Sequence, residues 1–324
     1  MKRNIKYSMI GFLLLFIIFL GMFSTYSFAN GNYNIALTKG TDIYIVSQYD
    51  DVAWKTTVNS STTPSNWFEG DANQTGAKSK NTIKGWNYVT WEMYDVFVSL
   101  FLSVLYEDEE LIPLLTILNI EGYNETTINN NYSNSYNLWV GLRAVWNFTI
   151  GSFEEDPTIS NDPLILFQNP QNIDEILSNY NNLSAELNSL PAIQFSSYSF
   201  PILEADEFLW LFIFNGLTLA TPFNSYLEEL ITALNCKNAT VNNNILTIKR
   251  TGETDYTTEI YFGTEGTISS FVVKDEGNNI IYQIITTNSD WIFFTTLIVL
   301  IISIGALTTY LIIRKIKIGK RRTK

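Results

Sequence analysis

The sequence lacks histidine entirely, and its 324 residues include a single cysteine, Cys236. Without imidazole there is no Ser-His-Asp or Cys-His nucleophile, no HExxH zinc helix and no histidine-containing zinc, haem or non-haem iron site. One cysteine allows no internal disulfide and no CxxC redox pair. We therefore predict a non-enzymatic chain without a cofactor, and we assign no catalytic, cofactor-binding or metal-binding residue. We interpret Cys236 as a half-buried small apolar residue, with intermolecular pairing as the alternative.

A carboxylate-based activity needs neither histidine nor cysteine, and the chain carries 32 Asp and Glu residues. Three clusters stand out, in the stretches YEDEEL, FEEDP and LEADEF. We interpret them as solvated turns, and whether they bind calcium stays open. The alternative is a histidine-free hydrolase, which needs two carboxyl groups about 5 to 9.5 Å apart across a sugar-binding cleft. The stretch that begins at Asp71 resembles the start of an EF-hand loop but does not match the full motif. Its twelfth position is Thr82, where calcium binding requires a glutamate.

An uncharged apolar run extends from Trp291 to Ile313, and seven of the eleven residues after it are Lys or Arg. At about 1.5 Å per residue, a helix over this run spans a hydrocarbon core of about 30 Å. We predict a transmembrane helix at residues 291–313 and a basic cytoplasmic tail at residues 314–324, since basic residues stay inside. The membrane is therefore a predicted partner.

A second apolar run, MIGFLLLFIIFLGMF, follows three basic residues at the N-terminus. The basic start, the apolar stretch and the small residues Ser27 and Ala29 predict a signal peptide at residues 1–29, cleaved after Ala29. An uncleaved signal anchor is the alternative. Together the two runs predict a single-pass type I protein of the cell membrane, with residues 30–290 outside the cytoplasm.

Acidic residues dominate the predicted extracellular segment. Three of the 20 Lys and Arg lie in the signal peptide and seven in the tail, which leaves this segment with a net charge of about −22. Such a charge repels nucleic acid and favours solubility. We therefore expect no nucleic-acid partner.

Asparagine makes up about one residue in ten, and the predicted extracellular segment contains seven Asn-x-Ser/Thr acceptor sequences. The predicted topology places these asparagines on the side of the membrane where glycans are attached. The candidates are Asn59, Asn73, Asn124, Asn131, Asn147, Asn182 and Asn238. Two of them lie in NETTINNNYSNSYN, residues 124–137, which we expect to be an exposed loop.

Four short β-rich runs precede the predicted transmembrane helix: ILTIKR, DYTTEIYF, TISSFVVK and NIIYQIIT. Glycine-containing turns separate them, which predicts an antiparallel meander. In the second run Tyr256, Thr258, Ile260 and Phe262 alternate with a second set of residues, so one face is expected to be buried.

Two amphipathic helices are predicted before the meander, at residues 172–190 with Asn172 as the N-cap, and at residues 224–235. Between them lies FLWLFIFNGLTLATPF, which is too short and too broken to span a membrane. We expect it to fill the core. It also supplies the candidate wall of an apolar ligand pocket, formed by Phe208, Trp210, Phe212 and Phe214.

Residues 30–160 are predicted to form a separate β-rich module, with strands at 41–50, 52–58, 86–103 and 138–150. Its tryptophans are expected to pack the core, with stacking on sugar rings as the alternative. Residues 161–290 would form the second module, built from the helical segment and the meander. The predicted fold class is α+β, with a predominantly antiparallel β ectodomain, two or more amphipathic helices and one C-terminal transmembrane helix.

The combination of a signal peptide, an Asn-rich β ectodomain ending in GTISSFVVKDEGNNIIYQI and an anchor helix resembles uncharacterised archaeal cell-surface proteins. This resemblance implies a surface location and supplies no functional residue. We expect a non-enzymatic ectodomain that binds an extracellular protein or a glycan. The alternative is an extracytoplasmic carrier or sensor of lipid or another apolar ligand, and the third hypothesis is the carboxylate-based hydrolase.

Overall fold

The computed structural model describes residues 28–30, 33–106 and 108–288. The predicted transmembrane helix, the basic tail and all but two residues of the predicted signal peptide lie outside the described residues. No helix within the described part of the chain combines the length and the apolar character needed to cross a membrane. Strand β1 (Phe28–Asn30) pairs with β2 (Tyr33–Ile35), and the predicted cleavage point after Ala29 lies within β1.

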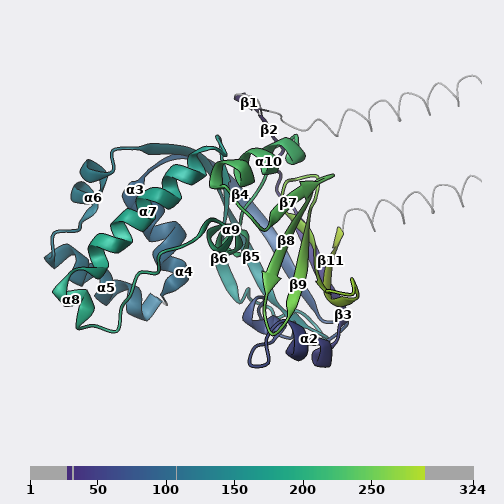
Figure 1. Ribbon diagram of the computed structural model, residues 1–324. Helices are drawn as coiled ribbons and strands as arrows, with labels where there is room; N and C mark the ends of the chain where they lie inside the picture. The colour runs from purple at the N-terminus through teal and green to yellow at the C-terminus, as the bar shows by residue number, and fades with distance from the viewer. Residues whose placement is uncertain (1–27, 31–32, 107, 289–324) are drawn as a thin grey trace, which may run out of the picture.

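A nine-stranded antiparallel sheet, curved into a half-barrel, forms one side of the molecule, on the right in Figure 1. Its strand order is β6-β5-β4-β3-β11-β10-β9-β8-β7. The α+β class with a large antiparallel sheet is thereby confirmed. The strands are β3 (Thr41–Tyr49), β4 (Lys78–Glu92), β5 (Ser135–Thr149), β6 (Ile159–Phe167), β7 (Ala239–Asn242), β8 (Ile245–Thr251), β9 (Asp255–Phe262), β10 (Ile268–Asp275) and β11 (Ile280–Asn288).

The predicted meander is confirmed as strands β8 to β11, each paired antiparallel with the next. In β9 the four alternate residues from Tyr256 to Phe262 are all buried, as their spacing predicts. Strand β11 then pairs with β3, with Ile285 opposite Ile45. The sheet therefore joins strands from both predicted modules, and the boundary predicted after residue 160 falls inside β6.

The predicted strand at residues 52–58 is wrong, because this segment is helix α2 (Asp51–Thr57). The Asp50 carboxylate accepts a hydrogen bond from the backbone N–H of Ala53 at 2.9 Å and caps the helix. A side-chain cap of this kind satisfies an N–H group that the first turn leaves unpaired. The cap outweighs the β-branched composition of the segment.

The predicted strand at residues 86–103 is correct only as far as Glu92, where β4 ends. The chain continues as α3 (Met93–Val96), a π-helical turn labelled η2 (Phe97–Leu102) and α4 (Ser103–Leu105). Phe97 and Phe101 are fully buried here. Their burial against other helices favours a helical backbone over the strand that their aromatic composition suggests.

The expected exposed loop at residues 124–137 is also wrong, because most of it is ordered into elements. Asn124 caps α6 (Glu125–Asn131) by accepting a hydrogen bond from the N–H of Thr127 at 3.0 Å. Strand β5 then begins at Ser135. Asparagine is as favourable at a helix N-cap as it is in a loop, which explains the error.

A helical lobe lies beside the sheet and consists of α3 to α8 with η2 (Figure 1). Its remaining helices are α5 (Asp108–Ile120), α7 (Asn172–Asn188) and α8 (Pro191–Gln194). The predicted amphipathic helix α7 is confirmed, but its N-cap is Gln171. The predicted cap, Asn172, instead accepts a side-chain hydrogen bond from Asn169 at 3.3 Å.

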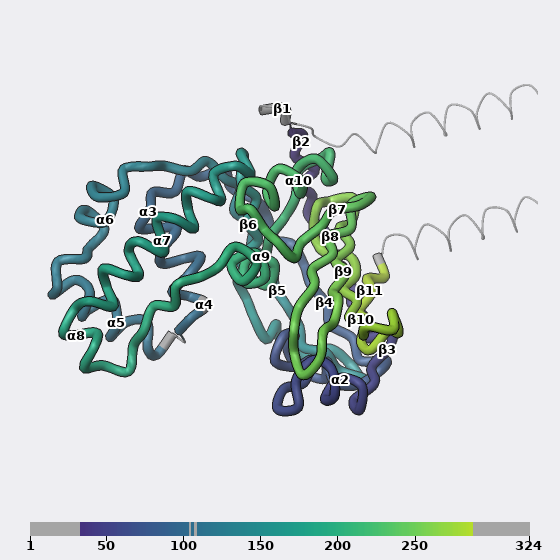
Figure 2. The backbone as a smooth tube through the Cα atoms, in the orientation of Figure 1, coloured from purple at the N-terminus to yellow at the C-terminus, as the bar shows by residue number. Residues whose placement is uncertain are grey.

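Two further helices, α9 (Ala205–Phe214) and α10 (Phe223–Leu234), lie between the helical lobe and the meander (Figure 2). Helix α10 confirms the second predicted amphipathic helix. Helix α9 is apolar on all sides after its acidic first turn, which is typical of a fully enclosed helix. A short helical turn, η1 (Pro64–Asn66), lies between α2 and β4 along the chain.

Candidate functional site

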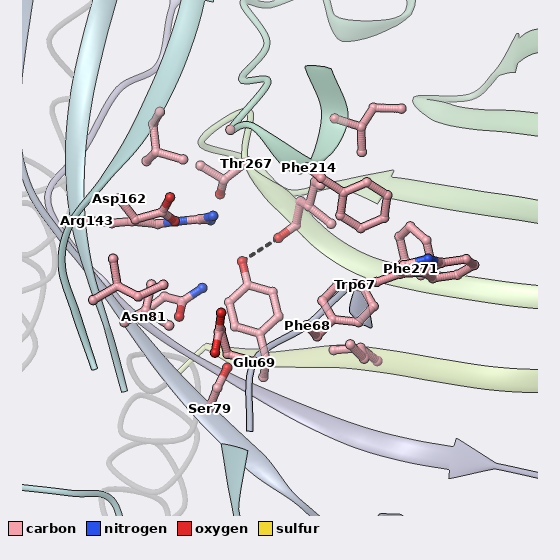
Figure 3. Close-up of a pocket in the computed structure, with 18 of the residues that line it drawn as sticks. Trp67, Phe68, Glu69, Ser79, Asn81, Arg143, Asp162, Phe214, Thr267 and Phe271 are labelled. Atoms are coloured by element: carbon pink, nitrogen blue, oxygen red, sulfur yellow. Dashed lines mark hydrogen bonds and ion pairs between the residues drawn. The ribbon is translucent and has the colours of Figure 1, made fainter. Parts of the chain in front are cut away.

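A cavity of about 250 Å³ lies between the sheet and the C-terminal end of α9. Its two sides differ in chemistry, as Figure 3 shows. The polar side is formed by side chains from four adjacent strands and one turn: Tyr44, Ser79, Asn81, Arg143, Asp162 and Thr267. The opposite side is formed by the aromatic residues Trp67, Phe68, Phe214 and Phe271.

The polar side of the cavity contains an ion pair, which forms because the register of two strands places its two residues opposite each other. Arg143 on β5 lies directly opposite Asp162 on β6. Directly opposed residues in an antiparallel pair project to the same face, so the two side chains meet. Arg143 Nε donates to Asp162 Oδ2, and only 22 % and 21 % of the two side chains are exposed. The ion pair therefore places a largely buried charge of each sign at the cavity.

Tyr44 is held in position by a hydrogen bond across the sheet. Its hydroxyl donates to the backbone carbonyl of Ile268 at 2.7 Å. Burial, aided by nearby Asp42 and Glu265 and opposed by Arg143, raises the pKa of Tyr44 to about 12. The phenol is therefore neutral at physiological pH and acts as a hydrogen-bonding group.

Asn81 supplies the least satisfied polar atom of the cavity. Its Oδ1 is buried and accepts no hydrogen bond from any described residue. A buried acceptor without a donor costs about 1 to 3 kcal/mol. A ligand that donates a hydrogen bond to this oxygen would remove that cost.

The apolar side is part of a larger aromatic cluster. The Phe68 ring lies 5.8 Å from Phe214 and 5.2 Å from Phe271, and both contacts are edge-to-face. Trp67 lies 5.9 Å from Phe271. Edge-to-face contacts of this kind fix ring orientations. The wall is thus a rigid apolar surface.

A backbone segment closes one end of the cavity. We call residues 216–221 the bridging segment. Thr218 N donates to Ile165 O of β6 at 2.9 Å, and Leu219 N donates to Gly266 O in the β9–β10 turn at 2.9 Å. The segment thereby connects the edge strand β6 with the β9–β10 turn. Gly216 and Leu217 also line the cavity.

The four residues of the predicted ligand wall divide into two pairs. Phe208 and Phe212 are fully buried and stack in a different aromatic cluster, with ring centroids of Phe101 and Phe208 5.3 Å apart. Phe214 lines the cavity. Trp210 lies behind Phe214 at 4.9 Å and is covered by the Arg250 guanidinium at 4.2 Å.

The polar residues of the cavity were not among the site residues predicted from the sequence. One signal was present, because Arg143 is the sole charged residue in LWVGLRAVWNFTI. A lone charge in an otherwise apolar strand indicates a buried partner or a functional site. The sequence does not show that this partner is Asp162.

The structure places the seven candidate glycosylation sites in two groups. Asn131, Asn182 and Asn238 are exposed, and Asn182 lies on the solvent side of α7. The other four are partly buried: Asn59, Asn73, Asn124 and Asn147. In the first three of these the side-chain oxygen accepts backbone hydrogen bonds, and in Asn147 it is buried.

Within the described residues, the FEEDP and LEADEF clusters do not converge on one site, and Glu107 of the YEDEEL cluster lies outside the described residues. Glu154, Glu155 and Asp156 are exposed in a loop. In the LEADEF cluster, Asp206 accepts hydrogen bonds from the backbone N–H groups of residues 237 and 238, and Glu207 pairs with Arg250 at 3.3 Å. In the described part of the chain no group of three or more potential metal ligands is arranged around one point.

The side chain of Cys236 is partly buried near Asp206. Burial, together with the Asp206 carboxylate, raises the pKa of the thiol to about 12. Because the thiolate is the reactive form, the raised pKa disfavours reactions of this cysteine at neutral pH.

No protein-family model matches the sequence, and no curated protein or solved structure shows a significant similarity to it. The candidate site is therefore defined by its geometry alone.

Proposed function

We propose that the chain is a membrane-anchored, outward-facing binding protein whose half-barrel holds a small amphiphilic ligand. The observation that carries this proposal is the two-sided cavity, with buried polar groups facing an aromatic wall. Small-molecule sites combine a mostly apolar lining with a few positioned polar groups. The membrane anchor rests on the apolar and basic C-terminal sequence.

The volume restricts the size of the ligand. Pockets for small molecules commonly measure about 300 to 1,000 Å³. A cavity of about 250 Å³ lies just below this range. It suits one ring or a short alkyl chain with a polar end. For the carrier hypothesis, we therefore propose a small amphiphile as the ligand and not a bilayer lipid.

Binding is favoured over hydrolysis by the state of the buried carboxylate. A carboxylate hydrolase needs one carboxyl group to transfer a proton and a second to act on the opposite side of the substrate. Asp162 is instead engaged by Arg143. We therefore assign it a structural and recognition role.

The test is ligand binding by the full chain in lipid nanodiscs, with 2-phenylethanol as the probe and empty nanodiscs as the blank. We expect saturable binding, measured by titration calorimetry. Val145→Phe should abolish it, because Val145 lines the cavity and the larger ring fills it. The matched control is Val52→Phe, at a valine that is 73 % exposed, which should bind like the wild type.

Overpacking costs about 1 to 3 kcal/mol and could unfold Val145→Phe, so a second variant tests the cavity independently. Phe214→Ala removes a ring from the cavity wall and should shift preference toward the larger probe 2-naphthylethanol. Equal binding of both probes by Val145→Phe, Phe214→Ala and the wild type would refute the proposal.

A further inference from the structure

Charged groups around the cavity are not balanced. The residues that line it include one cation, Arg143, and two carboxylates, Glu69 and Asp162. Asp162 already contacts Arg143, and Glu69 lies exposed beside the Asn81 side of the cavity (Figure 3). The cavity therefore carries one excess negative charge.

The residues around the cavity also carry a net negative charge. Asp42 lies directly opposite Asn81 on the neighbouring strand, and it lines a separate pocket with Lys39 and Glu265. The predicted extracellular segment as a whole carries about −22. A field of this sign concentrates cations near the surface and repels anions.

The free hydrogen-bond acceptor in the cavity and the negative charge of the cavity both favour a ligand that is a cationic donor. Asn81 Oδ1 is a buried acceptor that no described residue serves. A carboxylate ligand would bring further acceptors to this oxygen and would compete with Asp162 for Arg143. An ammonium group brings three donors and positive charge. The aromatic wall on the opposite side suits the apolar body of such an amine.

We propose that the cavity takes a primary amine with an apolar body, the ammonium group bonding to Asn81 Oδ1 and Asp162 and the body lying against Phe68, Phe214 and Phe271. This inference rests on the proposed function and specifies its ligand class. Asn81 and Asp162 are then the residues that determine the choice of polar end group.

The experiment compares three probes that share one apolar body: 2-phenylethylamine, 2-phenylethanol and 3-phenylpropanoate. Each is titrated into the full chain in phosphatidylcholine nanodiscs at neutral pH, with empty nanodiscs as the blank. The wild type should bind the amine at least about tenfold more tightly than the carboxylate, with the alcohol between them.

Two variants should change this order in different ways. Asp162→Asn releases the Arg143 guanidinium and should reverse the preference toward 3-phenylpropanoate. Asn81→Leu keeps the size of the side chain but removes the acceptor, and should weaken the amine about tenfold while leaving the carboxylate unchanged. Denaturant unfolding of each variant verifies that it is folded. Agreement with either pattern in a folded variant supports the proposal.

The outcomes separate this inference from the proposed function. If the alcohol binds but the carboxylate equals or exceeds the amine in the wild type, the choice of an amine is wrong and the binding pocket stands. If the amine binds equally well to Val145→Phe, it binds outside the cavity and the inference is overturned. If no probe binds, the proposed function itself fails.

Discussion

Helix α9 has two aromatic faces that meet different surroundings. Phe208 and Phe212 are one turn apart and lie on one face, where they pack against rings from β6 and the helical lobe. Trp210 and Phe214 lie on the opposite face, beside the cavity. The sequence FLWLFIF places two aromatic residues on each face. The elements that pack against each face decide which is filled and which is left beside a cavity.

The filled face is the result of an extended ring stack. Tyr180 and Phe101 stack with centroids 3.8 Å apart and planes 9° apart, and the stack continues through Phe208 to Phe212. Close-packed interiors of this kind leave no room for water. On the cavity face, Trp210 and Phe214 instead make edge-to-face or tilted contacts with Trp67, Phe68 and Phe271, and the polar strand residues lie across the cavity from these rings.

The largest expected loss of stability comes from a substitution at Phe212, on the filled face of α9. Phe212→Asp places an unpaired charge at a fully buried position, and we expect the loss of about 4 kcal/mol or more of the free energy of unfolding. The control is Phe195→Asp, at a phenylalanine that is 91 % exposed, which should change stability by less than about 0.5 kcal/mol. Urea unfolding followed by circular dichroism measures both. A stable Phe212→Asp variant would mean that this face is hollow too.

A somewhat smaller effect is expected at the closed end of the cavity. Gly266 has φ +81°, and a Cβ atom there would lie 2.0 Å from Leu219 O of the bridging segment. Gly266→Ala should therefore cost about 3 kcal/mol through strain and displacement of the segment. The matched control is Gly76→Ala, which has φ +91° but nothing within 4 Å, and should cost about 1 kcal/mol. Equal losses in urea unfolding would show that the close approach contributes nothing.

The smallest effect concerns the face of the meander that faces away from α9. Glu259 accepts hydrogen bonds from Lys274 Nζ at 2.6 Å and Tyr261 at 2.8 Å. Burial alone would raise the pKa of Glu259, but these hydrogen bonds and the Lys274 charge hold it below its ordinary value of 4.5. The ion pair therefore stabilises the fold fully above about pH 4.5, and this contribution is lost as the pH falls through the folded pKa.

Replacement of this carboxylate should show the corresponding pH dependence. Glu259→Gln should cost about 1 kcal/mol at pH 7, and the difference from the wild type should shrink below about pH 4.5. Glu155→Gln, in an exposed loop, serves as the control and should have little effect at any pH. A difference that stays constant with pH would mean that packing, and not charge, is responsible.

The parts of the fold that could be predicted were those with a local signal. The meander strands carry period-two alternation and glycine turns, and α7 and α10 carry a clear apolar stripe. The helical turn at Phe97–Leu102 has no such signal, because its β-branched and aromatic residues suit a strand equally well. Its helical state depends on burial against α7 and the segment near Phe200.

The candidate site could be predicted only in part. The aromatic run identified Phe214 as a ligand-wall candidate, but it did not distinguish Phe214 from Phe212, since helical phase relative to the sheet is a tertiary property. The Arg143–Asp162 pair depends on the register between two long strands, which a bulge near Arg143 shifts. A register of this kind follows from the packed sheet and not from the composition of either strand.

The bridging segment has a consequence for how copies of the chain meet. An edge strand with unpaired N–H and C=O groups is a template for strand addition and aggregation. At the β6 edge, Ile165 N donates to Gly216 O at 2.8 Å and Ile165 O accepts from Thr218 N, so the segment occupies part of that edge. The opposite edge, β7, is only four residues long. The segment at β6 and the shortness of β7 therefore both hinder the pairing of this sheet with that of a second copy.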